Sequence, residues 1–199
     1  MLCKRDFGSV GEEVNSHQEN YINLYLLRIE DYDPKCIEVE RKGLLFFAKK
    51  ISGQGYSNLR SGDLSKFKTV IAKVKMIDNT EKGNNCSPFL GGIYSLKEYK
   101  NNTPSLHITK KGIFFFHHPQ LHIFYGNKKM GDNIGLKFDS NGESLRIKVD
   151  NENDLLSFID DYENTWNKPL SEIVKEELLC FCFEMFEPNV KVQIQFLFN

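Results

Sequence analysis

VKVQIQFLF, residues 190–198, gives the clearest structural signal in this chain of 199 residues. Its apolar residues alternate with Lys191, Gln193 and Gln195. Successive side chains of a β-strand point to opposite faces, so a period of two places the apolar side chains together on one face. The stretch therefore predicts a strand that is buried on one side and meets water on the other.

Upstream of this strand, short apolar runs separated by turn residues fill much of the first 150 residues. Cys36–Glu40 alternates, Arg41-Lys42-Gly43 turns and Leu44–Ala48 is apolar, which is typical of a β-hairpin. Further runs are Ile93–Leu96, Leu106–Thr109, Ile113–Phe116, Leu121–Tyr125, Ile134–Phe138 and Ser144–Val149. We expect an antiparallel meander sheet in a mainly β segment at 21–150, after a loosely ordered start at 1–20.

Between residues 151 and 187 the apolar period lengthens to the three-to-four-residue spacing of an amphipathic helix. Pro169 favours the start of a second helix, which Pro188 ends. We therefore predict an α+β fold: an antiparallel meander sheet, two C-terminal amphipathic helices at 151–187 and a final strand at 190–198. All of residues 1–199 would form a single domain. The first helix rests on the spacing of Leu155, Phe158, Ile159, Tyr162 and Trp166.

Composition favours a globular protein with no membrane-spanning segment. Hydrophobic residues make up 40% of the chain and charged residues 27%, which argues against disorder. The longest apolar runs are far shorter than the roughly 20 residues that a membrane-spanning helix needs. The five cysteines are scattered, which fits a reducing compartment better than a disulfide framework. We expect a cytoplasmic protein with no cofactor.

The net charge of −1 hides an uneven distribution of charged residues along the chain. Residues 1–40 carry 4 basic and 9 acidic side chains, residues 41–137 carry 17 and 5, and residues 138–199 carry 5 and 13. Two interpretations compete. Either the fold interleaves these segments into a mixed surface, or the middle segment presents a basic face to nucleic acid, phosphoinositide or an acidic protein.

Four of the five histidines fall within residues 107–122. In a tight hairpin His117 and His122 would approach each other, and His107 would join them from a neighbouring strand. Three imidazoles can bind zinc or another divalent metal. Because no carboxylate near them in the sequence is placed to orient the rings, we predict no metal and keep these three as the candidate ligands.

Three stretches resemble known families. Asp31 and Asp33 with Glu40-Arg41-Lys42 are similar to the PD-(D/E)xK nucleases, in which carboxylates hold Mg²⁺ and the lysine positions water, although the gap before Glu40 is short. Gly92-Ile93-Tyr94 resembles the start of the GIY-YIG nucleases, whose second half is missing here. Ser144–Trp166, read as a strand leading into a helix, is similar in architecture to the end of a pleckstrin-homology-like barrel, and this likeness transfers no site.

The sequence contains no phosphate-binding loop, nucleophile elbow, zinc-protease motif or dinucleotide fingerprint. We therefore predict a non-enzymatic protein-binding protein, an immunity-type inhibitor or effector that acts through a charged surface. Charge matching of this kind mainly raises the rate and selectivity of association. The acidic face that would bind the partner is Asp150, Glu152, Asp154, Asp160, Asp161 and Glu163.

The alternative prediction is a nucleic-acid or anionic-ligand binder, including a metal-dependent nuclease, that uses the basic middle segment. Its binding residues would be Lys110, Lys111, Lys128 and Lys129, which lie at the ends of apolar runs. The identity of the partner and the oligomeric state are left open by the sequence.

Overall fold

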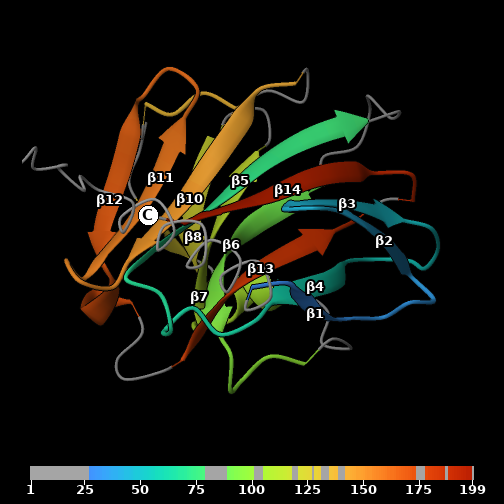
Figure 1. Ribbon diagram of the computed structural model, residues 1–199, viewed down its shortest axis with the longest axis horizontal. Helices are drawn as coiled ribbons and strands as arrows, with labels where there is room; N and C mark the ends of the chain where they lie inside the picture. The colour runs from blue at the N-terminus through green and yellow to red at the C-terminus, as the bar shows by residue number, and fades with distance from the viewer. Residues whose placement is uncertain are drawn as a thin grey trace, which may run out of the picture.

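Two antiparallel β-sheets of seven strands each make up the architecture of the computed structural model (Figure 1). The structure describes residues 27–78, 89–100, 105–117, 121–126, 128–130, 135–138, 142–173, 178–186 and 188–198. Within these ranges the only helical elements are two short 3₁₀ turns, η1 (Leu106–Ile108) and η2 (Leu170–Glu172). None of the helices in the described part has the length and apolar composition needed to cross a bilayer.

The first sheet, sheet A, runs in the order β1-β4-β13-β6-β7-β8-β9. The late strand β13 lies in its middle, between β4 and β6. The strands of sheet A are β1 (Ile29–Tyr32), β4 (Ser57–Ser61), β13 (Leu179–Met185), β6 (Phe89–Ser95), β7 (Gly112–His117), β8 (Leu121–Tyr125) and β9 (Lys128–Lys129).

The second sheet, sheet B, runs in the order β12-β11-β10-β5-β14-β3-β2. The last strand of the chain, β14, lies between β5 and β3. The strands of sheet B are β12 (Thr165–Pro169), β11 (Leu155–Asp160), β10 (Ser144–Asp150), β5 (Thr69–Asp78), β14 (Lys191–Phe198), β3 (Leu45–Lys50) and β2 (Ile37–Lys42).

One apolar core joins the inner faces of the two sheets. Phe181 of sheet A stacks on Phe196 of sheet B, with ring centroids 5.8 Å apart, and Phe115 meets Phe158 at 6.3 Å. Aromatic side chains bury a large apolar area each, so these contacts between the layers stabilise the sandwich strongly. On β14 the residues that alternate with Lys191, Gln193 and Gln195 are buried, which confirms the strand predicted from VKVQIQFLF.

The predicted helices at 151–187 are wrong, because the described parts of this segment form β11, β12, η2 and β13. Phe158 and Trp166 are cross-strand partners on β11 and β12, with rings 5.8 Å apart. A helix-like spacing thus arose from a hairpin in which apolar residues meet across two strands. All seven residues of β13 are buried, and a strand covered on both faces has no alternation to distinguish it from a helix. The fold is all-β rather than α+β.

Candidate functional site

Four of the six carboxylates in the predicted acidic face act within turns of sheet B. Asp160 is fully buried and accepts hydrogen bonds from the backbone N–H groups of Lys137, Tyr162 and Asn164 at 2.8–2.9 Å. Asp161 accepts from the backbone N–H of Ser144 at 2.6 Å. Asp150 and Asp154 likewise accept backbone bonds, from Asn153 and Ser171.

The remaining two acids of that face form ion pairs on the surface. Glu152 is 2.9 Å from the Lys68 ammonium group, and Glu163 is 2.6 Å from the Arg146 guanidinium group. The helix on which the prediction placed all of these acids except Asp150 does not exist, so they lie at strand ends and turns instead. Whether they bind a partner stays a prediction.

Hydrogen bonding lowers the pKa values of the buried Asp160 and of its exposed neighbour Asp161. Burial alone would raise the pKa of Asp160, but the bonds from Asn164, Lys137 and Tyr162 outweigh it and hold the pKa below its ordinary value. For Asp161, burial is likewise outweighed by the bonds from Ser144, so its pKa is lowered as well. These acids therefore stay ionised and stabilise the turns they hold.

The charges of distant segments are interleaved in the fold. Lys68 of the basic middle segment pairs with Glu152 of the acidic C-terminal segment, and Arg60 pairs with Glu30 of the N-terminal segment at 3.2 Å. These pairs agree with the first interpretation, a mixed surface, and give no support to a surface on which charges are segregated by segment. Charges that are separated along the chain become neighbours on the surface when the sheets bring distant strands together.

The four lysines of the alternative prediction lie at one end of sheet A. Lys128 and Lys129 form β9, the edge strand. Lys110 lies beside the turn before β9, because a Cβ built on Gly126 would come within 2.9 Å of the Lys110 Cγ. Lys111 forms an ion pair with Glu98 at 3.7 Å. Their role in binding anions stays a prediction.

The candidate histidines do not form one cluster in the described part of the chain. His107 Nδ1 lies 2.5 Å from the fully buried carboxylate of Glu184, a partner that the sequence could not show because β13 is far away in the chain. The strand register pairs His122 with Phe116 and His117 with Leu121, so these two histidines are not cross-strand partners. No set of three or more potential metal ligands occurs among the described side chains.

The residues that resemble a PD-(D/E)xK motif belong to different sheets. Asp31 lies on β1 of sheet A, where its carboxylate is 3.8 Å from Arg60 Nε. Glu40 and Lys42 lie on β2 of sheet B and form an ion pair at 3.0 Å. The fold therefore does not place the acid and the Glu-x-Lys on neighbouring strands, as that motif requires.

Two cysteines of β13, Cys180 and Cys182, are buried and free. Burial raises the pKa of Cys180 to about 12 and raises that of Cys182 well above its ordinary value. Both thiols stay protonated at neutral pH and are poor nucleophiles. They pack as small apolar residues against Tyr94 and Phe114 on the outer side of sheet A.

A groove of about 460 Å³ on the outer face of sheet B is the candidate site that the sequence did not reveal. It lies across β2, β3, β14 and the end of β5, which come from three separate parts of the chain, since β2 and β3 form one hairpin. The side chains of Phe47 and Ile77 supply exposed apolar surface, and Ile77 is 46% exposed. The charged residues that line the groove are Glu38, Glu40, Lys42, Lys49 and Lys191.

No protein-family model matches the chain, and no curated protein matches it in sequence. Among solved structures, the TRIM65 PSpry domain superposes with a TM-score of 0.57 at 10% identity, over 94% of this chain and 99% of that one. The SPRY domain of human HERC1 gives 0.54 at 14% identity, over 83% and 97%. The metal-free Emp46p carbohydrate recognition domain gives 0.51 at 9% identity, over 87% and 88%.

These likenesses overturn the α+β prediction and give no support to the immunity-type inhibitor that was built on it. At such low identity they show the fold and nothing more. The chain folds as a two-sheet β-sandwich similar to SPRY domains and to the Emp46p carbohydrate recognition domain.

Proposed function

We propose that this protein is a non-enzymatic binding module that recognises a partner protein through the groove on the outer face of sheet B. The observation that carries the proposal is the groove itself, in which the exposed Ile77 and the half-buried Phe47 are surrounded by charged side chains. Protein interfaces have this composition, with an apolar centre and a polar rim. The fold agrees with a binding role, since Emp46p uses a sandwich of this kind as a carbohydrate recognition domain.

The groove lies on strands that pair with one another in the sheet, which suits recognition. Phe47 stands opposite both Glu40 on β2 and Gln193 on β14 in the strand register, so the centre of the groove is held by two strand pairs. The Lys42 ammonium group lies 5.4 Å from the centre of the Phe47 ring and also pairs with Glu40. A preorganised surface loses little conformational entropy when a partner binds.

The test is to replace Ile77 by Asp and compare partner capture with that of a matched variant. Ile77→Asp places a charge in the apolar part of the groove, whereas Ile108→Asp makes the same change on η1, where Ile108 is 52% exposed. Both side chains are exposed, so both variants should fold. Proteins bound to the immobilised chain in a lysate of the native host are identified by mass spectrometry.

The expected result is a specific protein retained by the wild type and by Ile108→Asp and lost with Ile77→Asp. Equal capture by all three proteins would contradict the groove as the site. Parallel screens on a glycan array and on single-stranded oligonucleotides cover the other ligand classes. Groove-dependent binding in either screen, without a protein partner, would contradict the proposal.

A further inference from the structure

Four lysines on the outer face of sheet B line the groove or lie next to it, and we call them the lysine row. Lys49 on β3 and Lys191 on β14 line the groove, and Lys73 and Lys75 lie on the neighbouring strand β5. Their sequence neighbours Ala48, Val74 and Val192 are buried in the core. Strand alternation therefore directs all four lysines away from the core, to the same side of the sheet as the groove.

The strand register places like charges directly opposite each other. Lys49 is the partner of Lys191 across β3 and β14, and Lys73 is the partner of Arg146 across β5 and β10. Directly opposed like charges on neighbouring strands destabilise a sheet. A surface that keeps such pairs has a reason other than stability for doing so.

Only part of this positive charge is balanced within the described structure. Arg146 pairs with Glu163, and Lys73 interacts electrostatically with Asp161. Lys49 faces Glu38 in the register, without an ion pair. Lys75 and Lys191 likewise form no ion pair with any described carboxylate. Asp78 is opposite Lys191 in the strand register, and its side chain is not among those that the structure describes.

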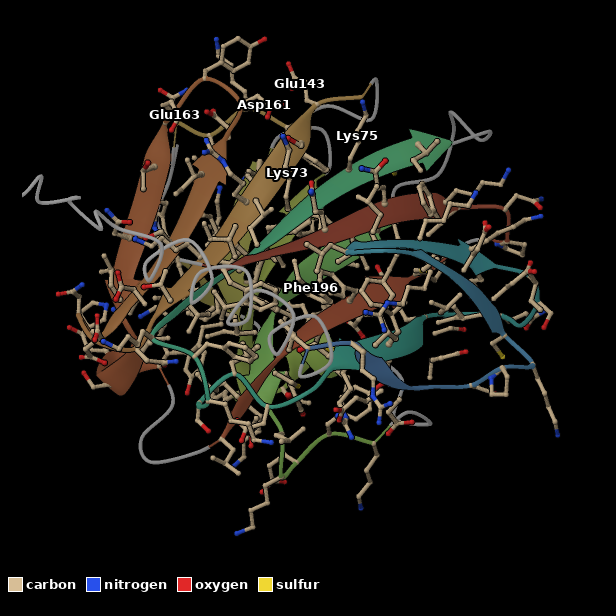
Figure 2. The ribbon with its side chains drawn as sticks, viewed as in Figure 1. Lys73, Lys75, Glu143, Asp161, Glu163 and Phe196 are labelled. Atoms are coloured by element: carbon tan, nitrogen blue, oxygen red, sulfur yellow. The ribbon has the colours of Figure 1, made fainter. Side chains whose placement is uncertain are left out.

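Acidic residues bound the lysine row on both sides. Glu38 and Glu40 on β2 flank it at one end. Figure 2 shows Lys73 and Lys75 on β5, with Glu143, Asp161 and Glu163 gathered at the ends of β10 and β11. From β3 to β5 there are two strand spacings, about 10 Å, and Lys75 lies opposite Gln193, two residues or about 7 Å along β14 from Lys191. Lys49 and Lys75 are therefore about 12 Å apart along the diagonal, which is the length of about four extended residues.

The extent of the lysine row decides which class of anionic ligand fits it. A nucleic acid carries a phosphate on every nucleotide, so its negatively charged backbone would extend beyond the row and meet the acidic residues on both sides. A short acidic stretch of a polypeptide is no longer than the row and would not reach those acids. Gln193 and Gln195 lie on β14 on the same face as Lys191, and they offer amide groups to a peptide backbone.

We propose that the lysine row binds an acidic segment of the partner protein, about four residues long and in extended form, with an adjacent apolar residue against Phe47 and Ile77. This inference rests on the proposed function, because it names the chemistry of the partner at the same groove. The carboxylates of the segment neutralise Lys49, Lys75 and Lys191. Because these charges lie near the surface, the interaction weakens as salt shortens the screening length.

The probe is a fluorescein-labelled synthetic peptide with one leucine followed by four alternating aspartates and glutamates. Its control has asparagine and glutamine at the acidic positions. Fluorescence anisotropy with the full chain measures the dissociation constants at low and high salt. We expect binding of the acidic peptide alone, weakened at least about tenfold between 0.05 M and 0.5 M salt.

Charge reversal locates the binding site. Lys75→Glu with Lys191→Glu should weaken peptide binding at least about tenfold, whereas Lys97→Glu with Lys100→Glu, which makes the same charge change on exposed lysines near sheet A, should not. If the reversed variant fails to fold, as judged by its thermal midpoint, Lys75→Gln with Lys191→Gln replaces it. Equal loss in both lysine pairs would show non-specific attraction and overturn the inference.

The outcomes separate this inference from the proposed function. If the acidic peptide does not bind but capture of a protein partner depends on Ile77, the inference of an acidic segment is overturned. The proposal that the groove binds a protein then still stands. Tighter binding of a single-stranded oligonucleotide, lost with the same lysines, would also overturn the inference of an acidic segment. Capture that does not depend on Ile77 would contradict the proposed function itself.

Discussion

Glu184 is a buried acid that holds the η1 segment on the outer side of sheet A. Its carboxylate accepts hydrogen bonds from the backbone N–H groups of Leu106 at 2.7 Å and His107 at 3.0 Å, besides its contact with the His107 ring. Tyr56 covers the same ring, with centroids 4.9 Å apart. The Glu184 carboxylate thus holds the η1 backbone against the sheet, and these hydrogen bonds account for its burial.

Replacing Glu184 by Ala should lower the free energy of unfolding by about 3 kcal/mol, since two buried backbone donors lose a charged acceptor. Equilibrium unfolding in urea measures the change. Glu184→Gln keeps one acceptor oxygen and should cost less than the alanine variant. If the two variants were equally stable, or if Ala matched the wild type, the Glu184 carboxylate would not contribute to stability.

Asp160 should make the stability of the fold depend on pH in the acid range. Its pKa is lower in the folded chain than in the unfolded chain, so its contribution is present above the unfolded pKa of about 3.9 and is lost as pH falls through the folded value. Thermal midpoints between pH 7 and pH 2.5 test this. Asp160→Asn should have a lower thermal midpoint than the wild type at pH 7, and its midpoint should fall less as the pH is lowered. If the midpoints of the variant and of the wild type fell equally with pH, Asp160 would not be the source of the pH dependence.

At the scale of elements, the close approach of β6 and β7 depends on a residue without a side chain. A Cβ on Gly92 would lie 1.8 Å from the carbonyl oxygen of Ile113, which is backbone and cannot move aside as a flexible side chain does. Gly92 is also the register partner of both Phe114 and Cys182, so it lies in the middle of sheet A.

Gly92→Ala should therefore destabilise the protein by about 3 kcal/mol or more, measured by urea unfolding. Ser95→Ala on the same strand is the control. The Ser95 hydroxyl is buried and has no hydrogen-bond partner among the described groups, so its removal should be neutral or slightly stabilising. Similar losses for the two variants would show that β6 tolerates no change and would contradict the specific role of Gly92.

Period-two alternation reveals the strands whose two faces differ, whereas β6 and β7 were found only as short apolar runs between turn residues. The strand at 190–198 and the hairpin of β2 and β3 have one face toward the core and one toward water, so period-two alternation reveals them. β13 is covered on both faces and lacks that contrast. In β11 and β12, Phe158 and Trp166 meet across the hairpin turn, and their separation along the chain imitates helical spacing.

The candidate groove was beyond sequence reasoning for a different reason. The sequence shows which side chains of β2, β3, β5 and β14 face outward, but not which strands are neighbours. Only the register brings Lys49 opposite Lys191 and Phe47 opposite Gln193. The acids of the predicted binding face were visible in the sequence, yet their hydrogen bonds to Lys137 and Ser144 depend on the same long-range pairing.

At the scale of the whole molecule, the two sheets share one apolar core, so we expect a single cooperative unfolding transition. Phe181 and Phe196 stack across the two layers with an interplanar angle of 15°. Phe196 is labelled between the layers in Figure 2. Either Phe→Ala change should cost about 3–5 kcal/mol because it leaves a cavity between the sheets.

The double variant should cost less than the sum of the two single changes, by about 0.5–1.5 kcal/mol, the extra attraction of an aromatic pair. Circular dichroism and tryptophan fluorescence follow the same unfolding curves, the latter through Trp166 on sheet B. Additive losses would show that the two rings are independent. Two separate transitions would contradict the prediction that the chain forms one domain.

The central positions of β13 and β14 have a consequence for synthesis of the protein on the ribosome. Until residues 179–198 emerge, β1 and β4 have no link to the rest of sheet A, and β2 and β3 have none to the rest of sheet B. A nascent chain stopped before that point would hold four half-built fragments with open apolar edges, which attract chaperones and promote aggregation. Sheet A therefore cannot be completed before β13 has been synthesised, and sheet B cannot be completed before β14 has.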